Sequence, residues 1–506
     1  MASGQLQRRL GLVSAISITV GAVIGSGIFL KPLGVAQALP SEAWIHTLWL
    51  GLGLVCLCGA FAYAELGAMF PEAGGQYAFL REGWGRFVGF LYGWTFFWVI
   101  NAGTVAALAI AFAKNLLPLF GYPSGPLRLQ PEHAAQLVGM DGLLAQAQHV
   151  VPSVGLGVFL QLGVDTGEPM RLTVAVAMIL LLAVVNHFGV GIGALVQNLS
   201  TFAKVFVIGL IVVGGLFFAG AGTSGSGGSA AAPAAGAAAG ATVAEWTLAG
   251  FVSAFMGIFW AYEGWYQMPF NAAELKRPER NLPLGLIGGM VILIGLYLLI
   301  NVIYLRAVPF EQMRAMPEGT PETIVASLTI ERVFSPQLSG YLTLLIAISI
   351  FGAANPNLLS SPRAFYAMGQ DGLVPAALTR VHGRWGTPTV AIWTQALVGA
   401  TLVLTMRTFG DVTDFVVFAS FLFYALTVAA VYRLRVTRPD LPRPYRCTLY
   451  PLAPAVFILV AVVFVGATLK DAGGQRNALK GLAIIAVGVP FYGLSRRRLS
   501  PGPAPR

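Results

Sequence analysis

Apolar residues in this chain gather in long runs, and short segments between the runs hold most of the charged and turn-forming residues. Each run has about 20 residues or more, the length that an α-helix needs to cross a hydrocarbon core of roughly 30 Å. Backbone groups in lipid must be paired internally, so spans of this length predict helices rather than barrel strands. We predict about twelve spans, at residues 11–34, 43–69, 86–117, 171–189, 193–220, 248–272, 283–306, 338–360, 388–406, 411–434, 449–470 and 479–495.

Composition supports the same environment. Hydrophobic residues make up 56% of the chain and charged residues only 10%, whereas soluble domains average about 45–50% apolar and about 25% charged residues. So few charges could not cover the surface of a soluble body of 506 residues. We therefore expect an all-α membrane protein in which most of the surface faces lipid.

The net charge of +10 could suggest a nucleic-acid partner, but the placement of the basic residues argues against one. They concentrate in alternate connecting segments, including Arg8 and Arg9, the 276–280 turn, the 433–446 segment and the arginines at 496–498. By the positive-inside rule, this bias predicts a multi-pass protein of the plasma (cell inner) membrane with both termini in the cytoplasm. The charge thus reflects topology, with attraction to anionic lipid as a secondary effect.

Residues of redox, metal or catalytic chemistry are few and scattered. Cys56, Cys58 and Cys447 are too few for a disulfide framework. The five histidines form no metal-ligand spacing and no Ser/His/Asp arrangement within one segment. We expect no enzymatic activity, no metal and no cofactor. We also expect no cleavable signal peptide, because the first apolar segment lacks a small-residue cleavage site.

Three segments are not predicted to span the membrane. Residues 118–170 form a long outside loop that contains several prolines and one short amphipathic helix around 132–150. Residues 219–245 are rich in Gly, Ala and Ser and nearly uncharged, which predicts a flexible linker. Residues 70–84 predict a short interfacial helix.

Two spans are interrupted near their centres. The first contains Gly21, Gly25, Ser26 and Gly27, and the sixth contains Glu263 followed by Gly264 amid aromatic residues. Each of these spans opens a group of five helices. Interrupted helices at corresponding positions of two halves indicate the binding site of an inverted-repeat transporter.

Gly25, Ser26 and Gly27 have three interpretations. They superficially resemble part of a dinucleotide-binding glycine fingerprint, but that motif needs a strand and a soluble βαβ unit. They could allow close packing of helices through small residues. We favour an unwound turn whose exposed N–H groups, at the start of a half-helix near Ile28, form a site for a carboxylate.

Among the charged residues within predicted spans, Glu263 and Lys204 are the candidates for a functional role. Glu263 is costly in lipid, so it should face water, substrate or a cation unless it lies near an interface. Lys204, early in the fifth span, could extend its ammonium to the cytoplasmic interface. It could instead be a fixed cation or a proton carrier inside the bundle. Trp260, Tyr262 and Trp265 could be packing residues or a gate over a pocket.

Five motifs in consistent order over roughly residues 10–435 resemble the L-type amino-acid transporters of the amino acid–polyamine–organocation superfamily. They are Gly25-Ser26-Gly27-Ile28-Phe29, Tyr63 to Gly67 with Pro71 and Gly74 to Tyr77, the hairpin Glu274 to Pro283, Phe351 to Asn355 with Ser360 to Arg363, and Asp371 to Pro375. Composition alone makes the hairpin a solvated turn with two prolines.

The resemblance implies a 5+5 inverted-repeat fold of the leucine-transporter type with discontinuous helices 1 and 6 and two extra helices. It implies that amides near Ser26 and Gly27 bind the substrate carboxylate. Carbonyls near Phe259, Trp260 and Ala261 would bind the amino group. Lys204 matches the lysine that stands where sodium sits in sodium-coupled relatives, which implies transport independent of sodium.

The chain departs from the family pattern at three places. Glu263 stands where the family usually has a small residue, and Trp260 stands where Phe is common, so both narrow the expected pocket. The loop 118–170 contains no cysteine. The disulfide to a heavy chain that is found in the animal branch therefore cannot form there, and we expect this chain to act without that partner.

The sequence thus predicts a single transporter domain over 1–506. Its parts are a first five-helix repeat at 11–220, the linker, a second repeat at 248–434 and two extra helices at 449–495. We predict sodium-independent exchange or facilitated transport of small neutral amino acids, with an amino-acid substrate and membrane lipid as partners and without nucleic acid or a disulfide-linked heavy chain. The predicted substrate-binding residues are Val23, Ile24, Gly25, Ser26, Gly27, Phe259, Trp260, Ala261 and Glu263, with Lys204 as the coupling or structural cation.

Two alternatives stay open at this point. Glu263 could pair with a second substrate amine, which suggests a proton-coupled or cationic amino-acid or polyamine carrier. A non-transporting amino-acid sensor would usually carry a substantial soluble output domain, and the predicted tails total only a few dozen residues, which disfavours that reading.

Overall fold

The computed structural model describes residues 10–71, 74–120, 167–188, 190–218, 247–317, 324–333, 336–385 and 387–499. Every regular element in these ranges is helical, and their only β feature is an isolated bridge between Leu10 and Leu275. The expected all-α fold is confirmed. The predicted helix at 132–150 and the predicted linker at 219–245 lie outside the described residues.

The first half of the chain forms a bundle of helices, with the short helix α5 in the segment predicted to be interfacial. Its elements are α1 (Leu12–Val23), α2 (Gly27–Leu30), α3 (Pro32–Ala38), α4 (Glu42–Met69), α5 (Gln76–Trp84), α6 (Arg86–Thr95), the π-helical turn η1 (Phe96–Asn101), α7 (Ala102–Leu116), the 3-10 turn η2 (Leu117–Phe120), α11 (Gly167–His187) and α12 (Val190–Phe218).

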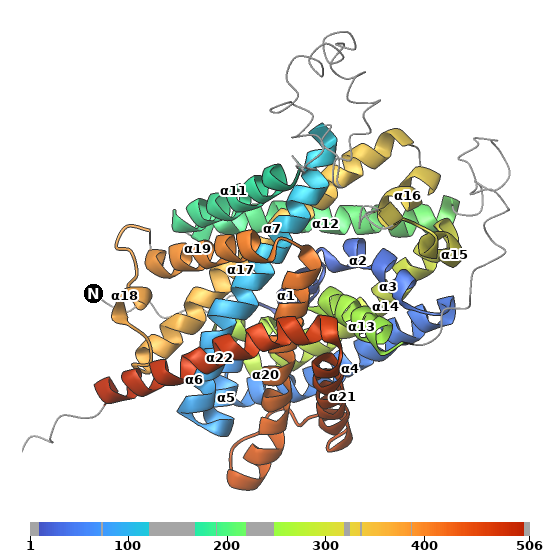
Figure 1. The fold of residues 1–506 in the computed structure, drawn as a ribbon. Helices are drawn as coiled ribbons and strands as arrows, with labels where there is room; N and C mark the ends of the chain where they lie inside the picture. The colour runs from blue at the N-terminus through green and yellow to red at the C-terminus, as the bar shows by residue number, and fades with distance from the viewer. Residues whose placement is uncertain are drawn as a thin grey trace, which may run out of the picture.

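The second half packs into the same bundle (Figure 1). Its elements are α13 (Leu248–Tyr262), the 3-10 helix η4 (Met268–Glu274), α14 (Pro278–Ala307), α15 (Phe310–Arg314), α16 (Ile324–Val333), α17 (Pro336–Gln370), α18 (Ala376–Thr379), α19 (Thr389–Met406), α20 (Phe409–Thr437), α21 (Leu452–Lys470) and α22 (Ala472–Leu499).

Nine helical segments in the described ranges are long and apolar enough to cross a membrane, judged by length and composition. They overlap the predicted spans 1 to 4, 7 and 9 to 12. Three shorter apolar helices, Lys204–Leu216, Leu248–Tyr262 and Thr343–Leu358, overlap predicted spans 5, 6 and 8. The chain is a multi-pass membrane protein, and the count of twelve spans stays a prediction.

Several helices are longer than the apolar runs that predicted them. Helix α17 runs from Pro336 to Gln370, beyond the predicted 338–360, and α14 begins at Pro278 rather than at 283. The thickness of the hydrocarbon core decides how many residues of a span must be apolar. The helix itself can continue beyond the core, because its backbone hydrogen bonds do not depend on the lipid. Proline in the first turn also suits a helix start, because its missing N–H would have no partner there.

Helix α14 lies along α4 and α1, while α17 lies along α7 and α12. Small residues permit the closest of these approaches. A Cβ added at Gly285 would stand 2.6 Å from the Ala15 Cβ, and one added at Gly289 would stand 2.7 Å from the Thr19 Cβ. Helix α1 is therefore held against α14 up to the point where α1 ends.

A buried carboxylate joins three segments near the end of α4. Glu65 is 1% exposed and accepts two hydrogen bonds from Arg435 of α20, with Nε–Oε1 at 3.0 Å and Nη2–Oε2 at 2.6 Å. The Cys447 N–H donates to Glu65 Oε2 at 2.7 Å, and Arg443 Nε lies 3.5 Å from Oε1. A buried charge is tolerated only when it is paired in this way, so this Glu65 cluster fixes the segment between α20 and α21 against α4.

A second polar cluster secures the interfacial helix α5. Asp371, just after α17, accepts hydrogen bonds from Tyr77 OH at 2.5 Å and from Arg81 Nη1 at 3.0 Å. Glu82 in turn pairs with Arg438 at 2.8 Å. Helix α5 therefore connects the end of α17 to the segment that follows α20.

Candidate functional site

The first span breaks after Val23. The Ile24 N–H still donates to Val20 O at 2.9 Å, and the next amides to find acceptors are those of Phe29 and Leu30, which both donate to Ser26 O at 3.1 and 2.9 Å. Among the described residues, none accepts a backbone hydrogen bond from the amides of 25–28. First-turn amides have no partner within their own helix, so the break presents a short row of free N–H donors.

The sixth span breaks after Tyr262. Glu263 leaves the helical conformation at φ −57° and ψ 138°, although its N–H still donates to Trp260 O at 3.1 Å. Gly264 follows with φ +107°, a conformation that favours glycine, and the chain re-enters a turn in which the Gln267 N–H donates to Gly264 O at 3.0 Å.

The two breaks contact each other directly. A Cβ added at Gly27 would lie 2.3 Å from Ala261 Cα and 2.9 Å from Ala261 N, so α2 touches the backbone of α13 at that point. A Cβ added at Gly264 would lie 2.7 Å from Ala22 O. Gly27 therefore has a packing role, and Gly25, whose added Cβ would meet nothing closer than 3.7 Å, leaves open space beside it.

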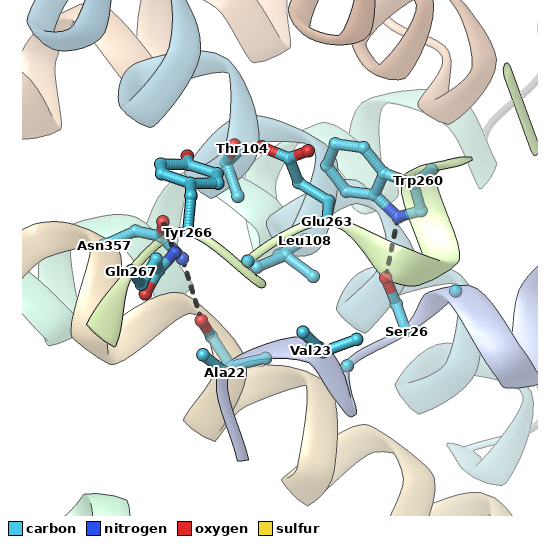
Figure 2. A pocket seen from close by; sticks show the side chains of 14 residues that line it. Ala22, Val23, Ser26, Thr104, Leu108, Trp260, Glu263, Tyr266, Gln267 and Asn357 are labelled. Atoms are coloured by element: carbon cyan, nitrogen blue, oxygen red, sulfur yellow. Dashed lines mark hydrogen bonds between the residues drawn. The ribbon is translucent and has the colours of Figure 1, made fainter. Parts of the chain in front are cut away.

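A small cavity lies between the two breaks (Figure 2). Its volume is about 30 Å³ for the centre of a water-sized sphere, enough for one or two waters, which need about 10–15 Å³ each. The Trp260 indole closes one side of it, where Nε1 donates to Ser26 Oγ at 3.2 Å. The lining residues are Ala22, Val23, Gly25, Ser26, Gly27, Thr104, Leu108, Trp260, Glu263, Gly264, Tyr266, Gln267, Ala353 and Asn357.

Glu263 lines this cavity rather than an end of the bundle. Its Oε1 accepts a hydrogen bond from Tyr424 OH at 2.7 Å, and Oε2 is buried without a partner of good geometry among the described residues. The Tyr266 ring packs against the Tyr424 ring with centroids 4.8 Å apart. One carboxylate oxygen is thus held by a phenol while the other is unpaired.

A polar wall faces the two breaks from other helices. Gln267 Nε2 donates to Asn357 Oδ1 at 3.3 Å, and Asn357 Nδ2 donates to Ala353 O at 3.0 Å. Asn101, in the π-helical turn η1, donates to Asn357 O at 3.2 Å. Thr104 completes this wall, and its hydroxyl donates to Ile100 O at 2.7 Å. Hydroxyl and amide groups therefore surround the cavity on the side away from α2.

Lys204 lies beside the first break but outside the cavity lining. The side chain is 1% exposed, and Nζ lies 3.5 Å from Gly21 O, near the end of α1. The ammonium is therefore inside the bundle rather than at an interface. It can act on the site through the position of α1.

The predicted site residues separate into two groups. Six of them line the cavity: Val23, Gly25, Ser26, Gly27, Trp260 and Glu263. Ile24, Phe259 and Ala261 do not. The Phe259 ring packs on Phe421 with centroids 4.2 Å apart, and Ala261 lies under Gly27 while its carbonyl accepts from Tyr297 OH at 2.9 Å.

Of the three aromatic residues considered as a gate, only Trp260 lines the cavity. Tyr262 OH donates to Trp49 O at 3.0 Å, and Trp265 packs edge-on against Tyr63 with centroids 4.8 Å apart. Both are packing residues of the helix bundle.

Sequence reasoning missed Thr104, Leu108, Tyr266, Gln267 and Asn357 as lining residues. Asn357 lies two residues beyond the motif that ends at Asn355, so that motif was the nearest signal for it. Thr104 and Leu108 are separated by one helical turn within a continuous apolar run, where no polar pattern marks a face.

Comparison with known proteins identifies relatives of the whole chain. The sequence model of the amino acid permease family matches residues 10–487. The chain is 29% identical to human b(0,+)-type amino acid transporter 1 over 460 residues, which cover 91% of this chain and 82% of that protein. It is 27% identical to the serine/threonine exchanger SteT of Bacillus subtilis (strain 168) over 501 residues, 98% of each chain. It is 28% identical to human large neutral amino acids transporter small subunit 2 over 492 residues, 96% of this chain and 80% of that protein.

Proposed function

This chain belongs to the amino acid permease family, among its L-type amino-acid transporters, and from that premise we propose that it moves small neutral amino acids across the plasma membrane by alternating access. Transport proceeds by sodium-independent exchange or facilitated transport. The observation that carries this proposal is the meeting of two broken helices at one cavity, with free amides on one side and Glu263 on the other.

The substrate backbone binds at the two breaks. Its carboxylate accepts hydrogen bonds from the amides at Gly25, Ser26 and Gly27, which have no other acceptor among the described residues. Its amino group lies at the end of α13, where the carbonyl oxygens of Trp260 and Ala261 accept one hydrogen bond each, from the Glu263 N–H and Tyr297 OH, and keep a second lone pair. The Trp260 indole, which bridges to Ser26 across the cavity, must move aside when substrate enters.

The surrounding side chains favour small substrates. Trp260 and Glu263 occupy most of the space between the breaks, and the cavity that remains is about 30 Å³. Thr104, Gln267 and Asn357 offer hydrogen-bonding groups to the substrate side chain. We expect alanine, serine and threonine to be preferred over tryptophan and tyrosine, and acidic amino acids to be excluded by the charge of Glu263.

Lys204 supplies a fixed positive charge next to the end of α1. A buried ammonium there makes a sodium ion at the same place electrostatically unfavourable. This position supports transport that does not depend on sodium.

The proposed organisation follows the two breaks. Residues 11–220 and 248–434 form two inverted five-helix repeats, 449–495 add two helices, and both termini lie in the cytoplasm. We further propose that the chain works without a disulfide-linked heavy chain. Cys56 is buried in α4, and burial raises the pKa of the Cys447 thiol to about 12, which keeps it in the unreactive thiol form.

A second candidate is a proton-coupled or cationic amino-acid carrier, and Glu263 favours it. Its unpaired Oε2 in the cavity wall could take the side-chain amine of a cationic substrate or carry a proton. A non-transporting sensor remains the least favoured reading, because the site sits between two breaks of the kind that alternating access uses.

The test is uptake of radiolabelled serine by the purified full-length protein in liposomes, with and without trapped internal serine. Exchange predicts uptake only with internal amino acid, and facilitated transport predicts uptake in both cases. Stimulation by an inward proton gradient, with lysine as a better substrate than serine, would favour the second candidate. No uptake of any amino acid by protein that binds serine would refute transport.

A further inference from the structure

A second, much larger cavity lies away from the substrate site. It is a groove of about 850 Å³ between α6 with η1, the segment after α17, α19 and α22. Its walls are almost entirely apolar and include Phe90, Trp94, Leu397, Val398, Leu402 and Phe491. Figure 1 shows α22 crossing beside α6.

Most of the polar groups in the groove are satisfied by the protein itself, whereas Trp98 Nε1 is buried without a hydrogen-bond partner among the described residues. The Thr394 hydroxyl donates to Val390 O at 2.8 Å, and the Thr401 hydroxyl donates to Leu397 O at 2.9 Å. The Trp94 Nε1 donates to Ile484 O at 3.0 Å. Such walls offer a water few hydrogen bonds, and a cavity holds water only where two to four polar partners are present. A hydrocarbon ligand is therefore favoured in this groove.

Three of the walls belong to segments apolar and long enough to cross the membrane, namely Arg86–Leu116, Thr389–Met406 and Gly474–Ser495. The groove thus lies within the depth of the bilayer. The hydrocarbon available at that depth in large amounts is the acyl chain of a phospholipid.

Basic residues gather at one end of the groove. Arg86 is exposed and begins α6, one turn before the lining residue Phe90. Arg380 is exposed and comes two residues after the lining residue Leu378. In the sequence, three arginines at 496–498 directly follow the lining residue Ser495. All three elements therefore bring arginine to the same end, the end that the charge distribution assigns to the cytoplasm.

We propose that this groove binds one anionic glycerophospholipid of the cytoplasmic leaflet. Its acyl chains lie between α19 and α22, and its phosphate pairs with Arg86 and Arg380. Arginine suits this role because its planar guanidinium matches phosphate oxygens and stays charged, and basic residues at the cytoplasmic surface attract anionic lipid. The proposal does not depend on the identity of the transported substrate.

Native mass spectrometry of the full-length protein tests the site directly. Delipidated protein in mild detergent is incubated with dioleoyl phosphatidylglycerol or dioleoyl phosphatidylcholine. We expect one phosphatidylglycerol to be retained, with at least tenfold preference over phosphatidylcholine. Equal retention of the two lipids, or of neither, would overturn the proposal.

Two sets of variants separate the groove from the lipid-facing surface in general. Leu397→Trp fills the groove and should lower phosphatidylglycerol retention at least tenfold, whereas the matched variant Leu459→Trp on α21 should not. The two leucines are similarly exposed, at 61% and 64%. Retention equal in the two variants would overturn the proposal.

Arg86→Gln with Arg380→Gln leaves the apolar walls intact and should remove the preference for the anionic lipid. This double variant also serves if Leu397→Trp fails to fold. A persistent preference in it would contradict the phosphate contact. A groove occupied by a second copy of the chain would appear as a dimer that Leu397→Trp dissociates without any change in bound lipid, and that outcome would also refute the proposal.

Discussion

The contact between Gly27 and Ala261 gives the sharpest prediction about the substrate site. In Gly27→Ala, the new Cβ would lie 2.3 Å from Ala261 Cα, 2.8 Å from Ala261 Cβ and 2.9 Å from Ala261 N. Carbon atoms in contact prefer about 3.5–4.0 Å, so α2 and α13 must separate by more than about 1 Å. The nearest atoms include backbone, which cannot turn aside as a flexible side chain could.

Overpacking of this kind costs about 1–3 kcal/mol, which is about 5- to 150-fold in an equilibrium constant. We expect the initial rate of amino-acid uptake into liposomes to fall at least about fivefold in Gly27→Ala, and Gly27→Val to abolish uptake. Membrane insertion should be unchanged, because the substitutions add apolar atoms. Uptake is measured per molecule of monodisperse protein, with thermal unfolding followed in parallel.

Gly21→Ala is the matched control. The same atom is added in the same interrupted span, in α1 rather than α2, and the added Cβ meets nothing within 4 Å, so transport should stay near wild type. The double variant Gly27→Ala with Ala261→Gly should recover little, since it removes only the 2.8 Å contact and leaves the two with the backbone. Wild-type uptake in Gly27→Ala, or complete recovery in the double variant, would refute the close contact of the two breaks.

Three further predictions concern side chains at the site. Glu263→Gly should admit larger neutral amino acids while Glu263→Gln keeps the size limit, as measured by competition against serine uptake; wild-type selectivity in both would mean that Glu263 does not shape the pocket. Replacing sodium by choline should leave the initial rate unchanged, and Lys204→Ala should lower it by loosening α1; a strict sodium requirement, or normal transport in the variant, would contradict the assigned role. Trp260→Phe removes the hydrogen bond to Ser26, whose net contribution is about 0.5–1.5 kcal/mol, so the apparent KM for serine should change by about 2- to 13-fold, and an unchanged KM would show that the indole does not compete with substrate.

The helices and both breaks could be predicted because their signals are local. A run of about 20 apolar residues identifies a span by itself. The clusters at Gly25 to Gly27 and at Glu263-Gly264 mark the interruptions without knowledge of any contact. The structure places the ends of α1 and α13 at Val23 and Tyr262, directly before these clusters.

The sequence could not predict which face of each helix lines the cavity. Successive residues of a helix point about 100° apart, so Phe259 and Trp260 cannot both face the same space, and nothing local decides between them. Where a helix is apolar on every face, its sequence pattern does not show which residues line the cavity. Residues such as Thr104 and Asn357 line it because of where their helices lie in the bundle. The partners of Glu65 were equally hidden, because Arg435 lies 370 residues further along the chain.

The pairing of Glu65 with Arg435 has a consequence for biogenesis. Synthesis at about 5–20 residues per second separates the two residues by roughly 20–70 s, and Arg443 and Cys447 emerge later still. During that interval the end of α4 is already in the membrane with a carboxylate that has none of its final partners. Glu65 must stay in water at the surface, so α4 reaches its final depth only when Arg435 and the residues after it have been made. In a chain truncated before residue 435, α4 should therefore not be fixed in the bundle. Cellular quality control would recognise such a chain as incompletely folded.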